Sequence, residues 1–254
     1  MKKHIKKALP AALLTSILIF VWAAISEFEI IPKFMLPSPI MVFSAFFKNL
    51  AVLSQHAVVT LFETFIGLII SLFLAFFTAV LMDRYVKIKL AIYPLLIVTQ
   101  TVPTIAVAPI IVLFFGYGIL PKVILVIVCC FFPITVALFD GLTSVPSDYL
   151  NLLKCMNANY VQTLFHLKIS FAVPHFFSGL KIAGTYAFIS AVVAEWLGGT
   201  TGLGVYMTRV KSAYSFDKLF ATIIFISIIS FIFIEVINLL QKIALTRLHM
   251  DKRG

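Results

Sequence analysis

Long apolar runs with few charged residues recur along this chain of 254 residues, and they constrain its fold more than any other feature. An α-helix needs about 20 mostly apolar residues to cross the hydrocarbon core of a bilayer. Because 62% of the residues are hydrophobic and 12% are charged, the chain cannot cover a water-facing surface with polar groups. This excludes a soluble enzyme, a disordered linker and a coiled coil. The sequence predicts an all-α, polytopic membrane protein with six transmembrane helices, at residues 8–26, 64–82, 90–121, 123–139, 180–197 and 219–240.

The third run, residues 90–121, is too long for one straight crossing and contains Pro94, Pro103 and Pro109 in its interior. We expect one kinked or broken helix there. Broken backbone at membrane depth persists only where it packs on protein or lines a cavity. The polar residues beside the break, Gln100, Thr101 and Thr104, are therefore candidates for lining a cavity.

The basic residues predict how the chain is oriented. Six spans place both termini on one side, and most of the 20 Lys and Arg residues fall on that side. Basic loops face the cytoplasm and meet anionic lipid headgroups, so both termini are predicted to be cytoplasmic. The net charge of +10 thus indicates contact with membrane lipid and not with nucleic acid, since no basic stripe is interleaved with aromatic residues. The first run is interpreted as an uncleaved helix and not as a signal peptide, because it is longer than a typical signal core.

The longest cytoplasmic segment, residues 143–179, carries an amphipathic helical pattern from about residue 148 to residue 163. Asp148 is a candidate cap for this helix, and Pro174 is expected to end the segment before the fifth span. The apolar face of the helix needs a partner, which is the headgroup layer, the protein's own bundle or another subunit docking from the cytoplasm.

Three acidic residues lie at or near membrane depth, where an ionisable group is costly. Glu63 is expected at the outer mouth of the second span and Glu195 near the outer end of the fifth. Each is either hydrated at the interface or faces a functional path. Glu235 lies in the inner half of the sixth span, where it either hydrogen-bonds a neighbouring helix or serves a function.

No catalytic or metal-binding constellation is visible in the sequence. A phosphate-binding G-x4-G-K-[ST] loop is missing, so the chain is not expected to bind ATP or to be an enzyme. The histidines are scattered, and Cys129, Cys130 and Cys155 do not have metal or redox spacing. The glycine-rich residues 198–202 are interpreted as a turn.

Several motifs occur in a fixed order along the chain. They are Leu36-Pro37-Ser38-Pro39, residues 60–67 (TLFETFIG), residues 102–109 (VPTIAVAP), residues 115–118 (FGYG), residues 131–133 (FFP), residues 179–183 (GLKIA), residues 193–199 (VAEWLGG) and residues 202–204 (GLG). Together they resemble the permease subunit of bacterial ABC importers. More narrowly, they resemble the branch that carries aliphatic sulfonates, taurine, nitrate and pyrimidine precursors of thiamine. The resemblance covers residues 36–240.

The resemblance implies a single permease domain over residues 1–254, with an N-terminal helix outside a five-helix core. It also implies two ATPase subunits, a second permease copy forming a homodimer, and an extracytoplasmic substrate-binding protein. ATP would be used by the partner subunit, and no cofactor would be bound by this chain. The implied location is the bacterial plasma membrane.

The cytoplasmic segment matches the family's ATPase-coupling loop in length and position but not in all residues. Asn151-Leu152-Leu153 stands where the family has Glu-Ala-Ala, and Asn157-Ala158 where it has Gly-Ala. The change to Asn is tolerable because Asn accepts left-handed backbone conformations. The residues expected to couple to the ATPase are Asn151, Leu152, Leu153, Met156, Asn157, Ala158 and Tyr160.

The expected substrate is a small heterocycle such as a pyrimidine precursor of thiamine, with an aliphatic sulfonate, taurine or nitrate as the alternative. A secondary transporter driven without ATP and a structural membrane scaffold are alternatives of other classes. The residues expected to line the translocation path are Glu63, Gln100, Thr101, Thr104 and Glu195.

Overall fold

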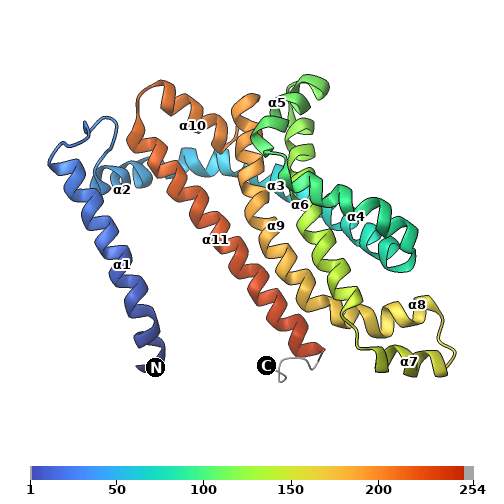
Figure 1. Ribbon diagram of the computed structural model, residues 1–254. Coiled ribbons are helices and arrows are strands. Elements are labelled where there is room, and N and C mark those ends of the chain that lie inside the picture. Colours follow the sequence, from blue (N-terminus) through green and yellow to red (C-terminus); the bar gives the residue numbers. More distant parts are fainter. Residues whose placement is uncertain (1, 249–254) are drawn as a thin grey trace.

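A computed structural model describes residues 2–248, so the ends of the predicted domain, residue 1 and residues 249–254, lie outside the described residues. All regular secondary structure in the described part of the chain is helical, and no strand occurs there (Figure 1). Its elements are α1 (Lys2–Glu27), α2 (Pro39–Lys48), α3 (Leu50–Arg84), α4 (Val86–Thr101), α5 (Thr104–Phe115), α6 (Ile119–Thr143), α7 (Ser147–Cys155), α8 (Tyr160–Thr163), the π-helix η1 (Leu164–Lys168), α9 (Ile169–Leu197), α10 (Leu203–Ser212) and α11 (Phe216–Arg247).

The predicted all-α, polytopic fold is confirmed. Among the described residues, four helical segments are long and apolar enough to cross a membrane: α3, α6, the continuous helix Tyr160–Leu197 and α11. Helices α4 and α5 pass the same test together but bend by 103° at their junction, so the count rises to five when this bent pair is taken as one crossing. The break itself agrees with the prediction from the prolines. In α1 the apolar part, Leu13–Glu27, is shorter than a full crossing. The count is therefore in rough agreement with six.

Two helices begin well before the spans predicted within them. The helix that contains the predicted second span begins at Leu50, because polar residues such as Thr60 and Glu63 find partners inside the bundle. The helix that contains the predicted fifth span begins at Tyr160, so the prediction that Pro174 ends the preceding segment is wrong. Proline is tolerated in membrane helices where neighbouring helices compensate the lost hydrogen bond, and α6 likewise contains Pro133.

The core forms where α6 packs between α3 and α9 (Figure 1). Small residues allow the close approach: a Cβ at Gly179 would overlap Ala137, and one at Gly141 would overlap the backbone of Ala172. In lipid, helices associate through such close backbone contacts because the solvent offers no hydrophobic driving force. These contacts hold the walls of the functional region in fixed register.

Helix α1 stands apart from this core in Figure 1. Its end is attached to the following segment by two hydrogen bonds, from Trp22 Nε1 to the Pro37 carbonyl and from Ser26 Oγ to the Leu36 carbonyl, both 3.0 Å. Ser38 then caps α2 by accepting from the Met41 amide. The Leu36–Pro39 motif thus connects α1 to the bundle, with α1 outside the core as the resemblance implies.

The predicted amphipathic helix from residue 148 to residue 163 is two helices, α7 and α8, separated by a turn at residues 156–159. Asn157 in this turn has a φ of 55°, so the expected left-handed conformation is present. Asp148 lies in the first turn of α7 but is not its cap, since Pro146 occupies that position. The start of α1 and the end of α11 lie at the same end of the molecule as α7, which we call the α7 end (Figure 1). Helix α10 lies at the opposite end, the α10 end.

Candidate functional site: a cavity beside the broken span

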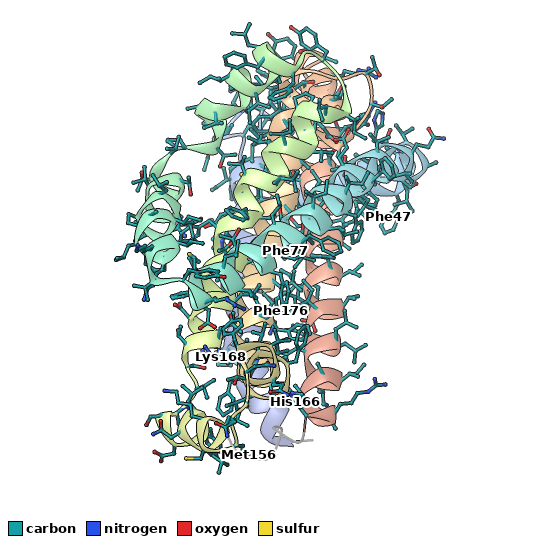
Figure 2. All side chains as sticks on the ribbon, turned by 90° about the vertical axis from the view of Figure 1, so that its right-hand side faces the viewer. Phe47, Phe77, Met156, His166, Lys168 and Phe176 are labelled. Carbon is teal, nitrogen blue, oxygen red and sulfur yellow. The ribbon has the colours of Figure 1, made fainter. Side chains whose placement is uncertain are left out.

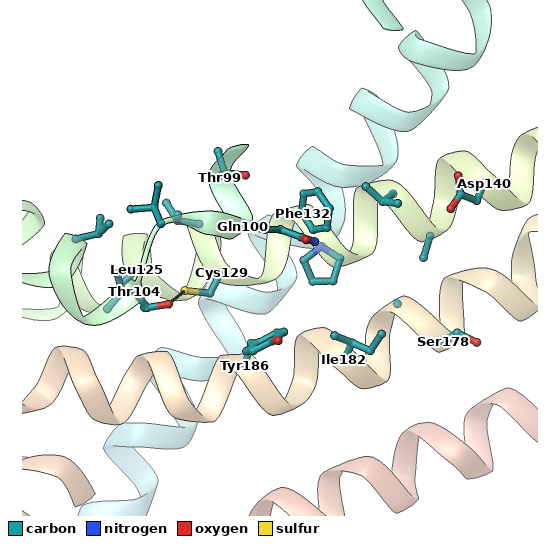
Figure 3. A pocket seen from close by; sticks show the side chains of 17 residues that line it. Thr99, Gln100, Thr104, Leu125, Cys129, Phe132, Asp140, Ser178, Ile182 and Tyr186 are labelled. Carbon is teal, nitrogen blue, oxygen red and sulfur yellow. Dashed lines mark hydrogen bonds between the residues drawn. The ribbon is translucent and has the colours of Figure 1, made fainter. Parts of the chain in front are cut away.

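A cavity of about 560 Å³ opens where the broken span meets the core. Figure 3 shows α6 on one side of it, with Phe132, and α9 on the other, with Tyr186, Ile182 and Ser178. Its lining comes from α4, α5, α6, α9 and the junction between α4 and α5: Thr99, Gln100, Val102, Thr104, Val107, Leu125, Val128, Cys129, Phe132, Pro133, Val136, Ala137, Asp140, Ser178, Gly179, Ile182 and Tyr186.

The break in the third span creates this cavity. Helix α4 ends at Thr101, and Pro103 starts α5 at a φ of −61° without offering a backbone N–H. The backbone at Val102 and Pro103 is extended, so the two helices turn sharply away from each other. The polar end of α4 is thereby placed against the α6 and α9 walls, which agrees with the rule that broken backbone lines a cavity.

The lining is mostly apolar, with a few polar groups and two aromatic rings. Cys129 Sγ lies 3.6 Å from Thr104 Oγ1, a contact that joins α6 to α5 (Figure 3). Phe132 and Tyr186 supply ring faces, and Gln100 supplies an amide. Among the described residues that line the cavity, Asp140 is the only one with a charged side chain. An apolar pocket with a few convergent polar groups is the usual form of a small-molecule site.

The five residues predicted to line the path do not lie together in the structure. Gln100 and Thr104 line the cavity. Thr101 adjoins it, but its hydroxyl donates to the Val98 carbonyl of its own helix at 2.8 Å. Glu63 and Glu195 lie elsewhere, both buried in the α10 half of the bundle.

Glu63 forms a buried ion pair that the sequence did not suggest. Its Oε1 lies 2.7 Å from Nζ of Lys122, and both residues are less than 5% exposed. Lys122 lies next to Pro121 at the start of α6, between the predicted third and fourth spans. Only a pairing signal between positions 63 and 122 would have revealed the bridge.

Glu195 holds the start of α10 in place. Its Oε2 accepts from the Gly204 amide at 2.6 Å, and its Oε1 accepts from the Thr60 hydroxyl at 2.7 Å. The Thr60 oxygen also accepts from the Leu203 amide at 2.9 Å. A carboxylate at a helix N-terminus satisfies free N–H groups and the helix dipole. The hydrated alternative for Glu195 is therefore wrong, because the carboxylate is enclosed by α3, α9 and α10.

Within the described part of the chain, Glu235 has no hydrogen bond to a neighbouring helix, contrary to one of its two predicted roles. It is exposed on α11 and accepts at 3.3 Å from Asn238 Nδ2 of the same helix. The residues 198–202 form the expected turn, with Gly199 and Gly202 at positive φ.

Helix α7 carries the candidate docking surface. None of its residues is buried, and Leu152 is 59% exposed. Met156, one turn further on, is 69% exposed and projects from the tip of the molecule in Figure 2. Tyr160 differs from the other predicted coupling residues because it faces inward, with its hydroxyl 3.0 Å from Asp83 Oδ2.

Comparison with known families settles the class of protein. Residues 67–249 match the model of the binding-protein-dependent transport system inner membrane component. The chain belongs to this family. The resemblance drawn from the motifs is thereby confirmed, and the protein is a multi-pass membrane protein of the importer-permease class.

Two curated relatives span nearly the whole chain. The formylaminopyrimidine transport permease protein ThiX of Halalkalibacterium halodurans is 36% identical, covering 96% of this chain and 97% of the relative. A probable ABC transporter permease protein of Haemophilus influenzae is 33% identical, covering 88% and 91%. The crystal structure of an amino acid ABC transporter with histidines has a TM-score of 0.62 at 18% identity, over 79% of this chain and 95% of that one, and supports the fold.

Proposed function

We propose that this chain is the membrane-spanning permease of an ATP-driven importer, in which two copies pair and two separate ATPase subunits hydrolyse ATP. A binding protein delivers the substrate from outside, and the chain itself binds no cofactor. The observation that carries the proposal is the combination, in one bundle, of a cavity beside a broken span with helix α7 at one end, none of whose residues is buried. Residues 1–254 act as one permease domain, with the coupling loop at residues 143–179.

The α7 end faces the cytoplasm in this proposal. The start of α1, the end of α11 and α7 all lie there (Figure 1). Arg84, Lys87, Lys89 and Lys154 lie in the segments nearest to that end, and basic residues favour the cytoplasmic side. An ATPase in the cytoplasm can then reach α7.

The exposed face of α7 takes the ATPase. Leu152 and Met156 lie four residues apart and so share one side of the helix, while Asn151 flanks them. An amphipathic helix lays such a face into an apolar groove of its partner. Leu153, Asn157 and Ala158 shape the helix end and the turn that follow, and Tyr160 connects this unit to the bundle.

The cavity is one wall of the translocation path, and the second copy completes it. Gln100 and Thr104 contribute polar groups to the path. In this proposal Thr101, Glu63 and Glu195 support the path without lining it. Thr101 is the last residue of α4, Glu63 connects α3 to α6, and Glu195 holds the start of α10.

The substrate that fits the cavity is a small nitrogen heterocycle related to pyrimidine precursors of thiamine. Phe132 and Tyr186 offer ring faces for stacking, and Gln100 and Asp140 offer acceptors for ring and amino N–H groups. The Asp140 carboxylate repels a sulfonate or nitrate. The similarity to the relative named for formylaminopyrimidine transport supports the same choice.

Recovery of an ATPase with the detergent-solubilised protein tests the importer. We expect an ATPase to co-purify with the native chain and to be lost with Met156→Asp or Asn151→Arg. Tyr214→Asp, an equivalent change at an exposed position of the α10 end, is the control and should retain it. If the native chain recovers none under mild conditions, ion-driven secondary transport becomes the better proposal.

The substrate is tested separately, with the complex and its binding protein in proteoliposomes. Formylaminopyrimidine, taurine and nitrate serve as probes of ATP-dependent uptake. We expect uptake of the pyrimidine only. Uptake of taurine or nitrate instead would contradict the proposed substrate but would agree with the proposed importer.

A further inference from the structure

A partly buried polar cluster lies at the α7 end, where the end of α3 meets the start of the helix Tyr160–Leu197. Lys168 Nζ bridges both carboxylate oxygens of Asp83, at 2.6 Å and 2.7 Å, and these side chains are 14% and 3% exposed. The Tyr160 hydroxyl lies 3.0 Å from Asp83 Oδ2 and 3.2 Å from the Val80 carbonyl oxygen. We call Asp83, Tyr160 and Lys168 the Asp83 cluster.

The route from α7 into the bundle passes this cluster. Helix α7 has no buried residue, and beyond Cys155 it continues through the turn containing Asn157 into α8. The start of α8 is firmly fixed, because Asn159 and Gln162 form a reciprocal capping box. Tyr160 is the first residue of α8, so a displacement of α7 that travels along this route arrives first at the Asp83 cluster.

The backbone next to the cluster is a π-helix, η1, which ends at Lys168. The wider turn of a π-helix places its side chains differently from an α-helix and is frequent at functional sites. His166 Nδ1 lies 2.9 Å from the Gln162 carbonyl oxygen in this turn. Figure 2 shows Lys168 between the bundle and the projecting tip that carries Met156.

Hydrogen bonds between ionised groups are shorter and stronger than neutral ones, and Lys168 Nζ makes two of them to Asp83. The Arg84 guanidinium, 4.9 Å from the centre of the Tyr160 ring, adds a second contact between the same two elements. The cluster therefore joins α3 and the start of the fifth span as one rigid unit at the α7 end.

We propose that Asp83, Tyr160 and Lys168 are the positioning residues through which the movement of α7 reaches α3 and, through the packing of α3 on α6, the cavity wall that α6 forms. The inference rests on the proposed function, since α7 moves only if an ATPase docks there. It predicts that a variant with a broken cluster still binds the ATPase, whereas its cavity no longer responds to nucleotide.

The test uses the permease–ATPase complex and needs no substrate. Cys129 and Cys155 are changed to Ser, and Ile182→Cys, an exposed position of the cavity lining, reports access to a maleimide. The measured quantity is the ratio of labelling rates with and without ATP plus vanadate. ATPase recovery is measured on the same samples.

Lys168→Met is the main variant, and Lys87→Met is the matched control. Lys87 is exposed near the same end and makes no hydrogen bond or ion pair within the described part of the chain. Tyr160→Phe, which removes one hydroxyl, and the exchange Asp83→Lys with Lys168→Asp complete the set.

We expect the parent and Lys87→Met to change their labelling rate by about fivefold or more on adding nucleotide, the range of a typical coupling between sites. Lys168→Met should retain the ATPase and show a ratio near one, Tyr160→Phe an intermediate ratio, and the charge exchange a partial recovery.

Three results would overturn the inference alone. The first is a parent-like labelling ratio in Lys168→Met, and the second is loss of the ATPase from that variant, which would make the cluster an element needed for folding. The third is a parent whose labelling rate does not change on adding nucleotide. A parent that recovers no ATPase overturns both the inference and the proposed function.

Discussion

Lys122 lies in the α10 half of the bundle with its Nζ 2.7 Å from Glu63 Oε1, and Glu63 Oε2 has no partner among the described residues. Removing one member of a buried ion pair leaves the other charge without compensation, at a cost of about 3–5 kcal/mol. We expect Lys122→Met to lower the unfolding temperature of the purified protein by roughly 10 °C. Glu63→Gln combined with Lys122→Met should recover most of the loss. A double variant as unstable as Lys122→Met would show that packing and not charge is responsible.

Gly202 immediately precedes α10, next to the Glu195 carboxylate. Its φ is 129°, and a Cβ there would overlap the Glu195 carboxylate that caps α10. We expect Gly202→Ala to destabilise the protein by more than the ~1–3 kcal/mol of backbone strain alone, measured as a fall in unfolding temperature. Gly116→Ala is the control, because Gly116 has a φ of 74° but open space around it. Equal losses in both variants would contradict the role given to the Glu195 carboxylate.

The turn between α7 and α8 is a feature at the scale of elements. Asn157 has a φ of 55°, a conformation that costs a β-branched residue roughly 1–2 kcal/mol and costs glycine little. We therefore expect Asn157→Gly to keep ATPase recovery unchanged and Asn157→Val to lower it, because α7 would leave the bundle at a different angle. Equal ATPase recovery for the two variants would show that the backbone conformation of this turn does not affect docking.

How far the elements could be predicted depends on where their partners lie. The spans predicted at residues 123–139 and 219–240 lie within helices α6 and α11, because lipid demands a continuous apolar run. The bend at Pro103 is found because proline has no N–H. The start of α3 at Leu50 was missed because Thr60 and Glu63 are satisfied by Glu195 and Lys122, far along the chain. The Asp83 cluster and the place of Asp140 in the cavity were not predicted for the same reason, since their neighbours in the fold are far away in the sequence. Gln100 and Thr104 were found because their site is created by a local break in the backbone.

At the scale of the whole molecule, the arrangement of its two ends determines what each can meet. Helix α7, the start of α1 and the end of α11 share one end, and the loop between α10 and α11, with Tyr214 72% exposed, lies at the other (Figure 1). The proposed importer requires the first end in the cytoplasm, where ATP is present, and the second outside, where a binding protein docks. This orientation can be measured without any partner.

Cys155, which is exposed on α7, and a Tyr214→Cys variant in a Cys155→Ser background report the two ends. In intact spheroplasts we expect a membrane-impermeant maleimide to label Tyr214→Cys, and to label Cys155 of the native chain only after the membrane is opened. The basic residues near α7 are the physical reason, since they favour the side on which the chain is made. Labelling of Cys155 in intact spheroplasts would place α7 outside, where an ATP-hydrolysing subunit has no substrate. The coupling role of α7, and the Asp83 cluster with it, would then be wrong, although the helical fold would remain unchanged.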